Sequence, residues 1–309
     1  MSATRSHRPL LDRLLSSSTL AFIRAGRRAG QSWWAILHGY AYGRWPYGYI
    51  GSAIGERREL WPLRALFGPF LVRALGKNGP QRWGAEYHGK VVPIDGATRL
   101  VAVGEAVDAI LPEQVIPHEN ARHLLLSGQG PIVALDCPCR LARTDPCLPL
   151  DVCLIVGEPF ASFILDHHPT RARSITAEEA IEILVAEADR GHVHHAFFKE
   201  AMLDRFYAIC NCCSCCCGAM TAHRQGTPML IASGYVAQVD AESCIGCGAC
   251  TERCPFNAIQ LADDLSQIDG QACMGCGICV RGCPEGALAL VRDPSRPAPL
   301  ELEEIRATG

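Results

Sequence analysis

Residues 243–261 read SCIGCGACTERCPFNAIQL, and residues 272–290 read ACMGCGICVRGCPEGALAL. The two segments align at a constant offset of 29 residues without a gap, so the chain contains an internal repeat. Each copy has four cysteines in the spacing C-x₂-C-x₂-C-x₃-C, followed directly by proline. The cysteines are Cys244, Cys247, Cys250 and Cys254 in the first copy and Cys273, Cys276, Cys279 and Cys283 in the second. This pattern indicates that the repeat binds metal.

The spacing suits iron–sulfur clusters for a geometric reason. Three thiolates on one tight C-x₂-C-x₂-C loop can reach three irons of a single [4Fe–4S] cube. Glycines at positions 246, 248, 275 and 277 let the backbone turn around the sulfurs and direct N–H groups toward them. Zinc is the alternative, but zinc takes four ligands in a closed tetrahedron and gives no reason for two four-cysteine runs that each end in proline.

The two runs resemble the bacterial two-cluster [4Fe–4S] ferredoxin family, with a complete motif match over about a fifth of the chain. The resemblance implies two [4Fe–4S] clusters, each taking its fourth thiolate from the other repeat. The implied ligands are Cys244, Cys247, Cys250 and Cys283 for the first cluster and Cys273, Cys276, Cys279 and Cys254 for the second. Strand patterns that fit this fold occur at 235–239, 258–261, 267–269 and 287–291.

Ten further cysteines lie outside the repeat, in the segments 137–153 and 210–217. A disulfide framework is typical of short secreted chains, so we expect a reducing compartment for this chain of 309 residues. The ten thiols suffice for one or two additional [4Fe–4S] clusters, with zinc or a redox-active disulfide as alternatives. The candidate ligands for additional clusters are Cys139, Cys147, Cys153, Cys212, Cys213, Cys215 and Cys216. The segment Cys216-Cys217-Gly218 resembles only part of the motif of the CCG-type domains of heterodisulfide reductases.

The segment between the N-terminal region and the repeat predicts a mixed α/β domain. We expect a strand at 131–135, another apolar run at 152–156, and helices at 104–111, 119–126 and 196–209. Thr176 and Glu179 form a capping box that predicts a helix ending near Gly191. The histidines within 166–168 and 192–195 lie in polar surroundings, so we expect solvated or capping roles for them. Phosphate-binding glycine loops are absent from the sequence, which disfavours a tightly bound nucleotide.

The N-terminal region is basic and rich in aromatic residues. Residues 1–83 contain 13 Lys and Arg but 3 acidic residues, as well as all five Trp of the chain. The stretch 10–23 predicts a short helix, 61–75 is a second apolar stretch broken by Gly68-Pro69, and no apolar run is long enough to span a bilayer. Trp and Tyr beside Arg are typical of membrane-interface anchors. Packing over the chain's own domain or docking to an acidic partner is the alternative.

These observations predict an α+β protein with four parts. We expect a basic aromatic arm over 1–88, a mixed α/β Cys-rich domain over 89–232, a ferredoxin-like two-cluster domain over 233–293 and a polar tail over 294–309. The expected function is single-electron relay within a redox complex, through redox partner proteins and without nucleic acid. The expected location is cytoplasmic, with peripheral membrane contact through the arm. The alternative is a reductase whose catalytic centre lies among Cys137–Cys217.

Overall fold

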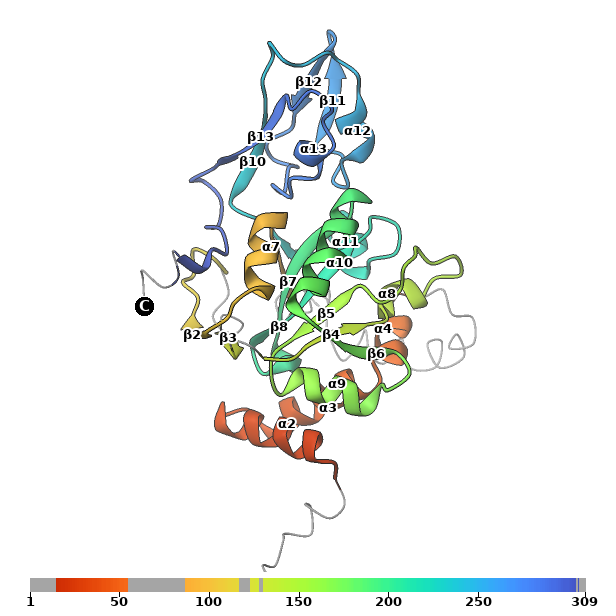
Figure 1. Cartoon of the computed structure of the whole chain (residues 1–309), viewed down its shortest axis with the longest axis vertical. Coiled ribbons are helices and arrows are strands. Elements are labelled where there is room, and N and C mark those ends of the chain that lie inside the picture. The colour runs from red at the N-terminus through yellow and green to blue at the C-terminus, as the bar shows by residue number, and fades with distance from the viewer. Residues whose placement is uncertain (1–14, 55–86, 117–122, 128–129, 304, 306–309) are drawn as a thin grey trace, which may run out of the picture.

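The computed structural model describes residues 15–54, 87–116, 123–127, 130–303 and 305 (Figure 1). The apolar stretch 61–75 and the start of the stretch 10–23 lie outside the described residues. A nine-stranded sheet forms the centre of the described part, and its main path runs β6-β4-β5-β8-β7-β1-β9. The path strands are β1 (Tyr87–Val91), β4 (Ile132–Leu135), β5 (Cys153–Val156), β6 (Ala172–Ile175), β7 (Val193–Lys199), β8 (Arg205–Cys212) and β9 (Leu230–Ile231). The hairpin β2 (Ala106–Ile110) and β3 (His123–Ser127) joins this sheet through β8.

Two apolar cores cover the two faces of this sheet, because side chains alternate along each strand. On β5, Cys153 and Ile155 face one core while Leu154 and Val156 face the other. The second core contains residues of α7 (Ile94–Val101) and α10 (Ala177–Asp189). The first core contains residues of α2 (Ser17–Arg28), α3 (Trp33–Arg44), α9 (Phe160–His167) and α11 (Gly218–Arg224). The sheet therefore lies between two layers of helices, with the N-terminal helices on the first face.

The described N-terminal residues pack onto the sheet domain. Phe22 of α2 and Ile36 of α3 are buried in the first core, beside Phe160 and Phe163 of α9. Helix α4 (Pro46–Ile54) follows and contacts the short helix α8 (Pro138–Leu141). Ser16 and Ser32 cap α2 and α3 by accepting a hydrogen bond from a backbone N–H of the first turn. Residues 15–54 are thus part of the first layer of helices.

The sequence correctly predicts the strand at 131–135 and the helix after Thr176, whose hydroxyl accepts from the Glu179 N–H, and the apolar run 152–156 contains β5. Three predicted helices are wrong. The segment 104–111 contains β2, the described end of 119–126 is β3, and 196–209 contains most of β7 and part of β8. Every residue of β7 is buried, and so are all but one of β8. A strand buried on both faces has no alternation, so its apolar pattern resembles that of a buried helix.

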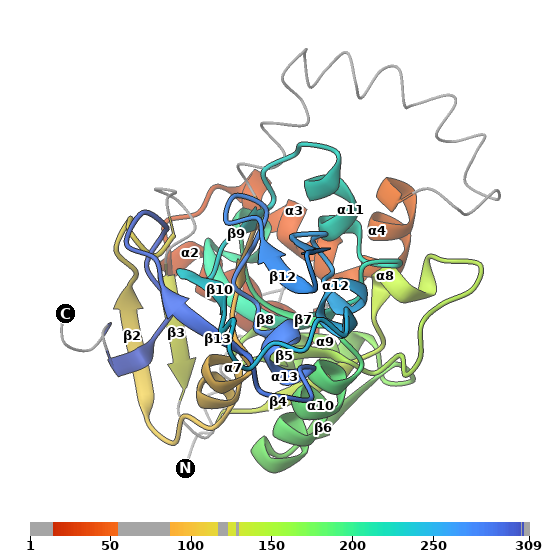
Figure 2. The same ribbon diagram turned by 90° about the horizontal axis from the view of Figure 1, so that it is seen from above.

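The C-terminal part forms a separate layer above the sheet domain, coloured blue in Figures 1 and 2. It contains two antiparallel pairs, β10 (Tyr235–Val239) with β13 (Leu288–Arg292) and β11 (Ile259–Ala262) with β12 (Leu265–Ile268). Two short helices, α12 (Ala249–Arg253) and α13 (Ile278–Arg281), follow the cysteine loops. These strands fall within a residue or two of their predicted positions. The repeat in the sequence therefore appears as a repeated loop–helix–strand unit.

Candidate metal centres

The eight cysteines of the repeat gather around two cavities. Of these cysteines, Cys244, Cys247, Cys250 and Cys283 line the first cavity, and Cys254, Cys273, Cys276 and Cys279 line the second. Each cavity therefore takes three thiols from one repeat and one from the other. Four thiols around a space of their own fit the ligand number of a [4Fe–4S] cluster. These are also the two groupings that the ferredoxin resemblance implies.

Backbone N–H groups and a hydroxyl support the thiols of these cavities. The N–H groups of Ala287 and Ala258 donate to Cys283 Sγ and Cys254 Sγ, each at 3.3 Å. Cys250 Sγ lies 3.0 Å from Ser266 Oγ. Backbone hydrogen bonds from Ser266 and Gly246 lower the pKa of Cys244. Donors of this kind stabilise thiolates, and hydrogen bonds to ligand sulfurs help to set a cluster's reduction potential.

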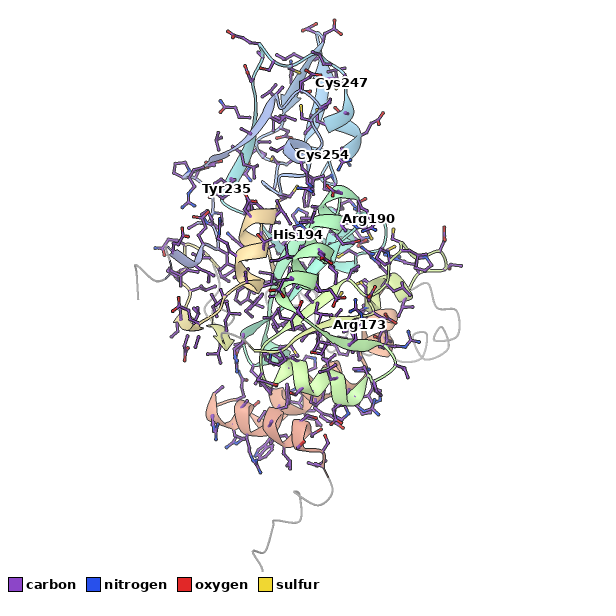
Figure 3. All side chains as sticks on the ribbon, viewed as in Figure 1. Arg173, Arg190, His194, Tyr235, Cys247 and Cys254 are labelled. Atoms are coloured by element: carbon purple, nitrogen blue, oxygen red, sulfur yellow. The ribbon has the colours of Figure 1, made fainter. Side chains whose placement is uncertain are left out.

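The two cavities differ in their exposure. Cys247, at the first cavity, is exposed, whereas Cys273 and Cys279, at the second, are buried. Figure 3 shows Cys247 near the free end of the C-terminal layer and Cys254 close to the sheet domain. Burial raises the pKa of Cys279 to about 12. The first cavity is thus accessible from solvent, while the second lies between the first and the sheet domain.

A third cavity, of about 70 Å³, lies in the first core of the sheet domain. Several of the cysteines that line it lie on neighbouring strands, and we call the lining cysteines together its cysteine wall. Cys153 of β5 pairs in register with Cys210 of β8, and Cys212 lies two residues further along on the same face. Cys137 lies two residues after the end of β4, at the N-cap of α8, and Cys139 is in α8. Cys217, at the start of α11, and Cys213 complete the cysteines of this lining.

Six of these thiols form a connected series of sulfur contacts. The contacts run from Cys210 to Cys153, Cys137, Cys139, Cys217 and Cys212. The neighbouring Cys139 thiol, together with burial, raises the pKa of Cys137 to about 12. Thiols held this close in an apolar interior suit a bound metal, because a metal replaces the protons and compensates the thiolate charge. We call these six residues the buried cysteine set.

Polar side chains of the same cavity are few and held in place. Arg140, which follows Cys139, is 1% exposed and donates to the Asn211 carbonyl oxygen at 3.2 Å and to the Glu187 carboxylate. Tyr42 and Tyr207 also line the cavity, with their hydroxyl oxygens 3.0 Å apart. The positive charge of Arg140 is thus paired with the Glu187 carboxylate, next to the cysteines that line the cavity.

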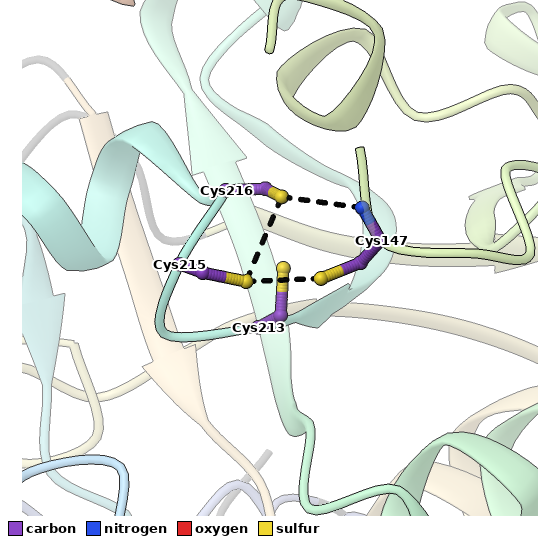
Figure 4. A group of neighbouring side chains, drawn as sticks. All are labelled: Cys147, Cys213, Cys215 and Cys216. Carbon is purple, nitrogen blue, oxygen red and sulfur yellow. Dashed lines mark hydrogen bonds between the residues drawn. The ribbon is translucent and has the colours of Figure 1, made fainter. Parts of the chain in front are cut away.

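A fourth group of thiols lies beside this cavity. The Sγ atoms of Cys147, Cys213, Cys215 and Cys216 all lie within 4.8 Å of one another (Figure 4). Cys147 Sγ lies 2.9 Å from Cys215 Sγ, which in turn lies 3.6 Å from Cys216 Sγ. Cys213 alone of the four also lines the third cavity. We call these four residues the surface cysteine set, because Cys215 is exposed.

The structure therefore divides the ten additional cysteines differently from the candidate ligand sets of the sequence. Of the predicted ligands, Cys139, Cys153 and Cys212 belong to the buried set, whereas Cys147, Cys213, Cys215 and Cys216 belong to the surface set. Sequence reasoning left out three members of the buried set, Cys137, Cys210 and Cys217. Cys210 could have been recognised from its i, i+2 spacing to Cys212, which places both thiols on one face of a strand. The wrong prediction of a helix at 196–209 concealed this spacing.

The second cavity of the C-terminal layer adjoins the core that holds the buried cysteine set. Met274 and Ile278 are buried in that core, and Cys276 packs against it. The Phe256 ring lies edge-on to His223 of α11, with ring centroids 6.1 Å apart. On the outer side, Arg281 pairs with Asp189 of α10 at 2.5 Å. One continuous apolar contact therefore connects the second cavity to the cysteine-lined core.

Of the five histidines in 166–168 and 192–195, three are buried, contrary to the solvated roles predicted for them, and the other two, His167 and His192, are half-buried. His168 lies 2.8 Å through Nε2 from the Gly43 carbonyl oxygen, and His194 lies 2.6 Å through Nδ1 from Asn211 Oδ1. His194 and His195 are both in β7, every residue of which is buried. Burial lowers the pKa of His194 to about 4 and that of His195 to about 3, so both are neutral near pH 7.

Comparison with known proteins identifies the C-terminal layer. Residues 237–290 match the family described as 4Fe-4S dicluster domain. The chain therefore contains a [4Fe–4S]-binding domain near its C-terminus, after a mixed α/β part. A search of curated proteins found no match to the chain. No helix among the described residues combines the length and the apolar character needed to cross a membrane.

Proposed function

We propose that this chain is an iron–sulfur electron-transfer protein with at least three cluster sites in sequence. Two lie in the C-terminal layer, held by the two four-cysteine sets that line its cavities. The third lies at the buried cysteine set. A [4Fe–4S] cluster, when bound, accepts and releases one electron at a time. The order of exposure supports a direction of electron transfer: the first cavity has an exposed cysteine, none of the four cysteines of the second is exposed, and the buried cysteine set lies in the core of the sheet domain.

The observation that carries this proposal is the contact between the second cavity and the sheet domain. Cys276 packs against the same apolar core that contains Cys212 and Cys217, both of the buried set. If the C-terminal domain exchanged electrons only with partner proteins in solution, the loop that carries Cys276 would have no need to pack against this core. The covered surroundings also exclude water from this contact, and the apolar shell of a cluster influences its potential.

Iron and sulfide analysis of anaerobically purified protein tests the third site. Two clusters require about eight irons per chain and three require about twelve. The paired variant Cys153→Ser/Cys210→Ser should lose the third set of signals in the EPR spectrum of the reduced protein and keep the other two. The control Cys247→Ser should instead perturb one C-terminal cluster. About eight irons in both the wild type and the paired variant would contradict the third site.

A reductase is the second candidate, favoured by the hydroxyls of Tyr42 and Tyr207 at the cavity. Burial raises the pKa of Tyr42, so this hydroxyl keeps its proton in the folded protein. A small molecule bound in this cavity would meet two phenols beside a cysteine-held centre. Titration with cyanide distinguishes the two functions. A change confined to the third EPR signal indicates an open iron, as a reductase requires, whereas unchanged signals favour the relay.

We also propose that helices α2 and α3 dock on an anionic membrane surface. Trp33, Trp34 and Leu37 are 61%, 78% and 57% exposed, and Arg27 and Arg28 lie in the last turn of α2. The Arg27 guanidinium lies 5.0 Å from the centre of the Trp33 ring. Figure 1 shows α2 at the end of the molecule opposite the C-terminal layer. Docking there leaves the exposed cavity free for a redox partner.

Vesicle sedimentation tests this docking. The protein should bind vesicles with a high content of phosphatidylglycerol, and binding should weaken as salt rises, because screening reduces the attraction of Arg for the surface. The variant Trp33→Ser/Trp34→Ser should bind at least tenfold more weakly. Ile110→Ser removes a 77% exposed side chain from β2 and serves as the control. Equal binding by both variants would contradict the proposed surface.

A further inference from the structure

The surface cysteine set differs from the other three thiol groups in its compactness. A tetrahedral zinc–thiolate site has Zn–S distances of about 2.3 Å, which places its sulfurs about 3.8 Å apart. The four sulfurs of Cys147, Cys213, Cys215 and Cys216 lie within 4.8 Å of one another, with two contacts of 2.9 and 3.6 Å. The ligands of a [4Fe–4S] cube lie farther apart, because four irons and four sulfides stand between them.

The cavities give independent support. Each thiol group proposed to hold a cluster surrounds a cavity. In contrast, Cys147, Cys215 and Cys216 line none of these three cavities, and Cys213 alone of the four lines the third cavity. The thiols of the surface set face one another (Figure 4). A single ion fits such an arrangement, whereas a cube would have to force the loops apart.

The surroundings suit a site with net negative charge. Four thiolates around one divalent ion leave a charge of −2, which nearby donors and cations stabilise. The backbone N–H of Cys147 points to Cys216 Sγ at 3.5 Å. Arg143 donates through Nε to the Cys216 carbonyl oxygen at 3.2 Å, so its guanidinium lies beside the set. Cys213 and Cys216 have the C-x₂-C spacing that is common in zinc sites.

We infer that the surface cysteine set binds one Zn²⁺ ion through four thiolates, as a structural site separate from the clusters. Zinc is preferred to Fe²⁺ by the same ligands according to the Irving–Williams order. The ion would join the loop between α8 and β5, which carries Cys147, to the turn after β8. That turn connects directly to Cys212 and Cys217 of the buried set. Because zinc has no redox chemistry, its role there is to fix the wall of the third cavity.

Metal analysis and X-ray absorption of the full anaerobic protein test this inference without depending on the cluster proposal. We expect about one zinc per wild-type chain, with four sulfur neighbours at about 2.3 Å. Cys147→Ser and Cys215→Ser should each lower the zinc content at least fivefold and leave the iron content within about a tenth of the wild type. Cys153→Ser, in the buried set, should keep its zinc.

Three outcomes would overturn the inference. The first is a loss of about four irons in Cys147→Ser with no zinc in the wild type, which would show a cluster. The second is a single iron with the visible absorption of a ferric tetrathiolate. The third is a Cys147–Cys215 disulfide in peptide mapping of non-reduced protein. The absorption measurement on the wild type keeps the test valid if a variant does not fold. If the proposed third cluster is absent, the iron content and the EPR signals would differ from the values expected above, but the zinc content would not.

Discussion

Arg140 and Glu187 form an ion pair in which both side chains are 1% exposed. Arg140 directly follows Cys139, and Glu187 lies on α10, on the other side of the sheet. Glu187 also lies 2.6 Å from His192 Nδ1 and accepts from Arg190 at 3.0 Å. The pair therefore connects the cysteine wall of the third cavity to the opposite helical layer, through the interior of the protein.

Removal of one partner should be costly, because it leaves the other charge buried and unpaired. We expect Glu187→Gln to lower the free energy of unfolding by about 3–5 kcal/mol. The matched control is Asp151→Asn, which breaks the exposed pair with Arg173 and should cost about 0–1 kcal/mol. Urea unfolding of anaerobic protein, followed by circular dichroism, measures both. Similar small losses in the two variants would contradict a buried, intact pair.

The cysteine loops depend on glycines for two different reasons, which a pair of variants separates. Gly275 has φ +65°, and a Cβ there would overlap the Tyr235 carbonyl oxygen and Ser233 Oγ. Gly248 has φ +75° with no atom within 4 Å of the same Cβ position. We expect Gly248→Ala to cost about 1–2 kcal/mol from the left-handed backbone alone. Gly275→Ala should cost more and should lower occupancy of the second cavity's cluster.

Iron content and EPR spectra of the two variants measure this difference. Gly275→Ala should lose up to about four irons per chain, and Gly248→Ala should keep nearly all of them. Equal losses would mean that backbone conformation, and not the close approach of Tyr235, limits assembly of the loop.

The C-terminal layer was predictable because its information is local. The spacing of Cys244 to Cys254, and of its copy, fixes loop geometry within a few residues, and the flanking strands follow. The fold of 87–232 is determined by long-range pairing instead. The register that joins Cys153 to Cys210 spans 57 residues and leaves no periodic signal in either segment. Strands such as β7, buried on both faces, lose the alternation that would distinguish them from helices.

The same reason explains the division of the ten additional cysteines. Neighbours in sequence need not share a site: the adjacent Cys212 and Cys213 belong to the buried and surface sets, whereas the adjacent Cys215 and Cys216 both belong to the surface set. On a strand, successive side chains point to opposite faces, so adjacent thiols separate. Cys147 joins Cys215 only because the loop before β5 passes the turn after β8. Neither contact could be inferred from spacing without the sheet.

Helix α3 lies close enough to the sheet domain to exclude a methyl group. A Cβ at Gly39 would overlap the Ala201 carbonyl oxygen and approach the Phe22 ring. We expect Gly39→Ala to lower the free energy of unfolding by about 1–3 kcal/mol, as overpacking does. Gly48 in α4 has open space around it, so Gly48→Ala should raise stability by up to about 1 kcal/mol through helix propensity. Thermal unfolding of both variants decides whether α3 packs as described; equal stabilisation would contradict the packing.

Asp204 provides a pH-dependent test of the contact between the N-terminal helices and the sheet. It lies in the turn between β7 and β8, at φ 56°, and accepts a hydrogen bond from the Gln31 amide. Burial raises the pKa of Asp204 from 3.8 to about 6, against the opposing effect of Gln31. The folded protein thus binds this proton more tightly than the unfolded chain does. Stability should fall as pH rises from about 4 to about 6, and the loss is complete above that.

Asp204→Asn removes the buried charge and keeps an acceptor for Gln31. The variant should be more stable than wild type at pH 7–8, by about 0.5–1 kcal/mol. This advantage should shrink as pH falls from 7 to 5, because the wild-type carboxyl then gains its proton. Asn also tolerates positive φ well, so Asp263→Asn, at an exposed position with φ 50°, is the control for the backbone effect. Urea unfolding at pH 5, 6, 7 and 8 measures the difference. An advantage that stays constant over this range would place Asp204 in contact with solvent and contradict its burial beneath Gln31.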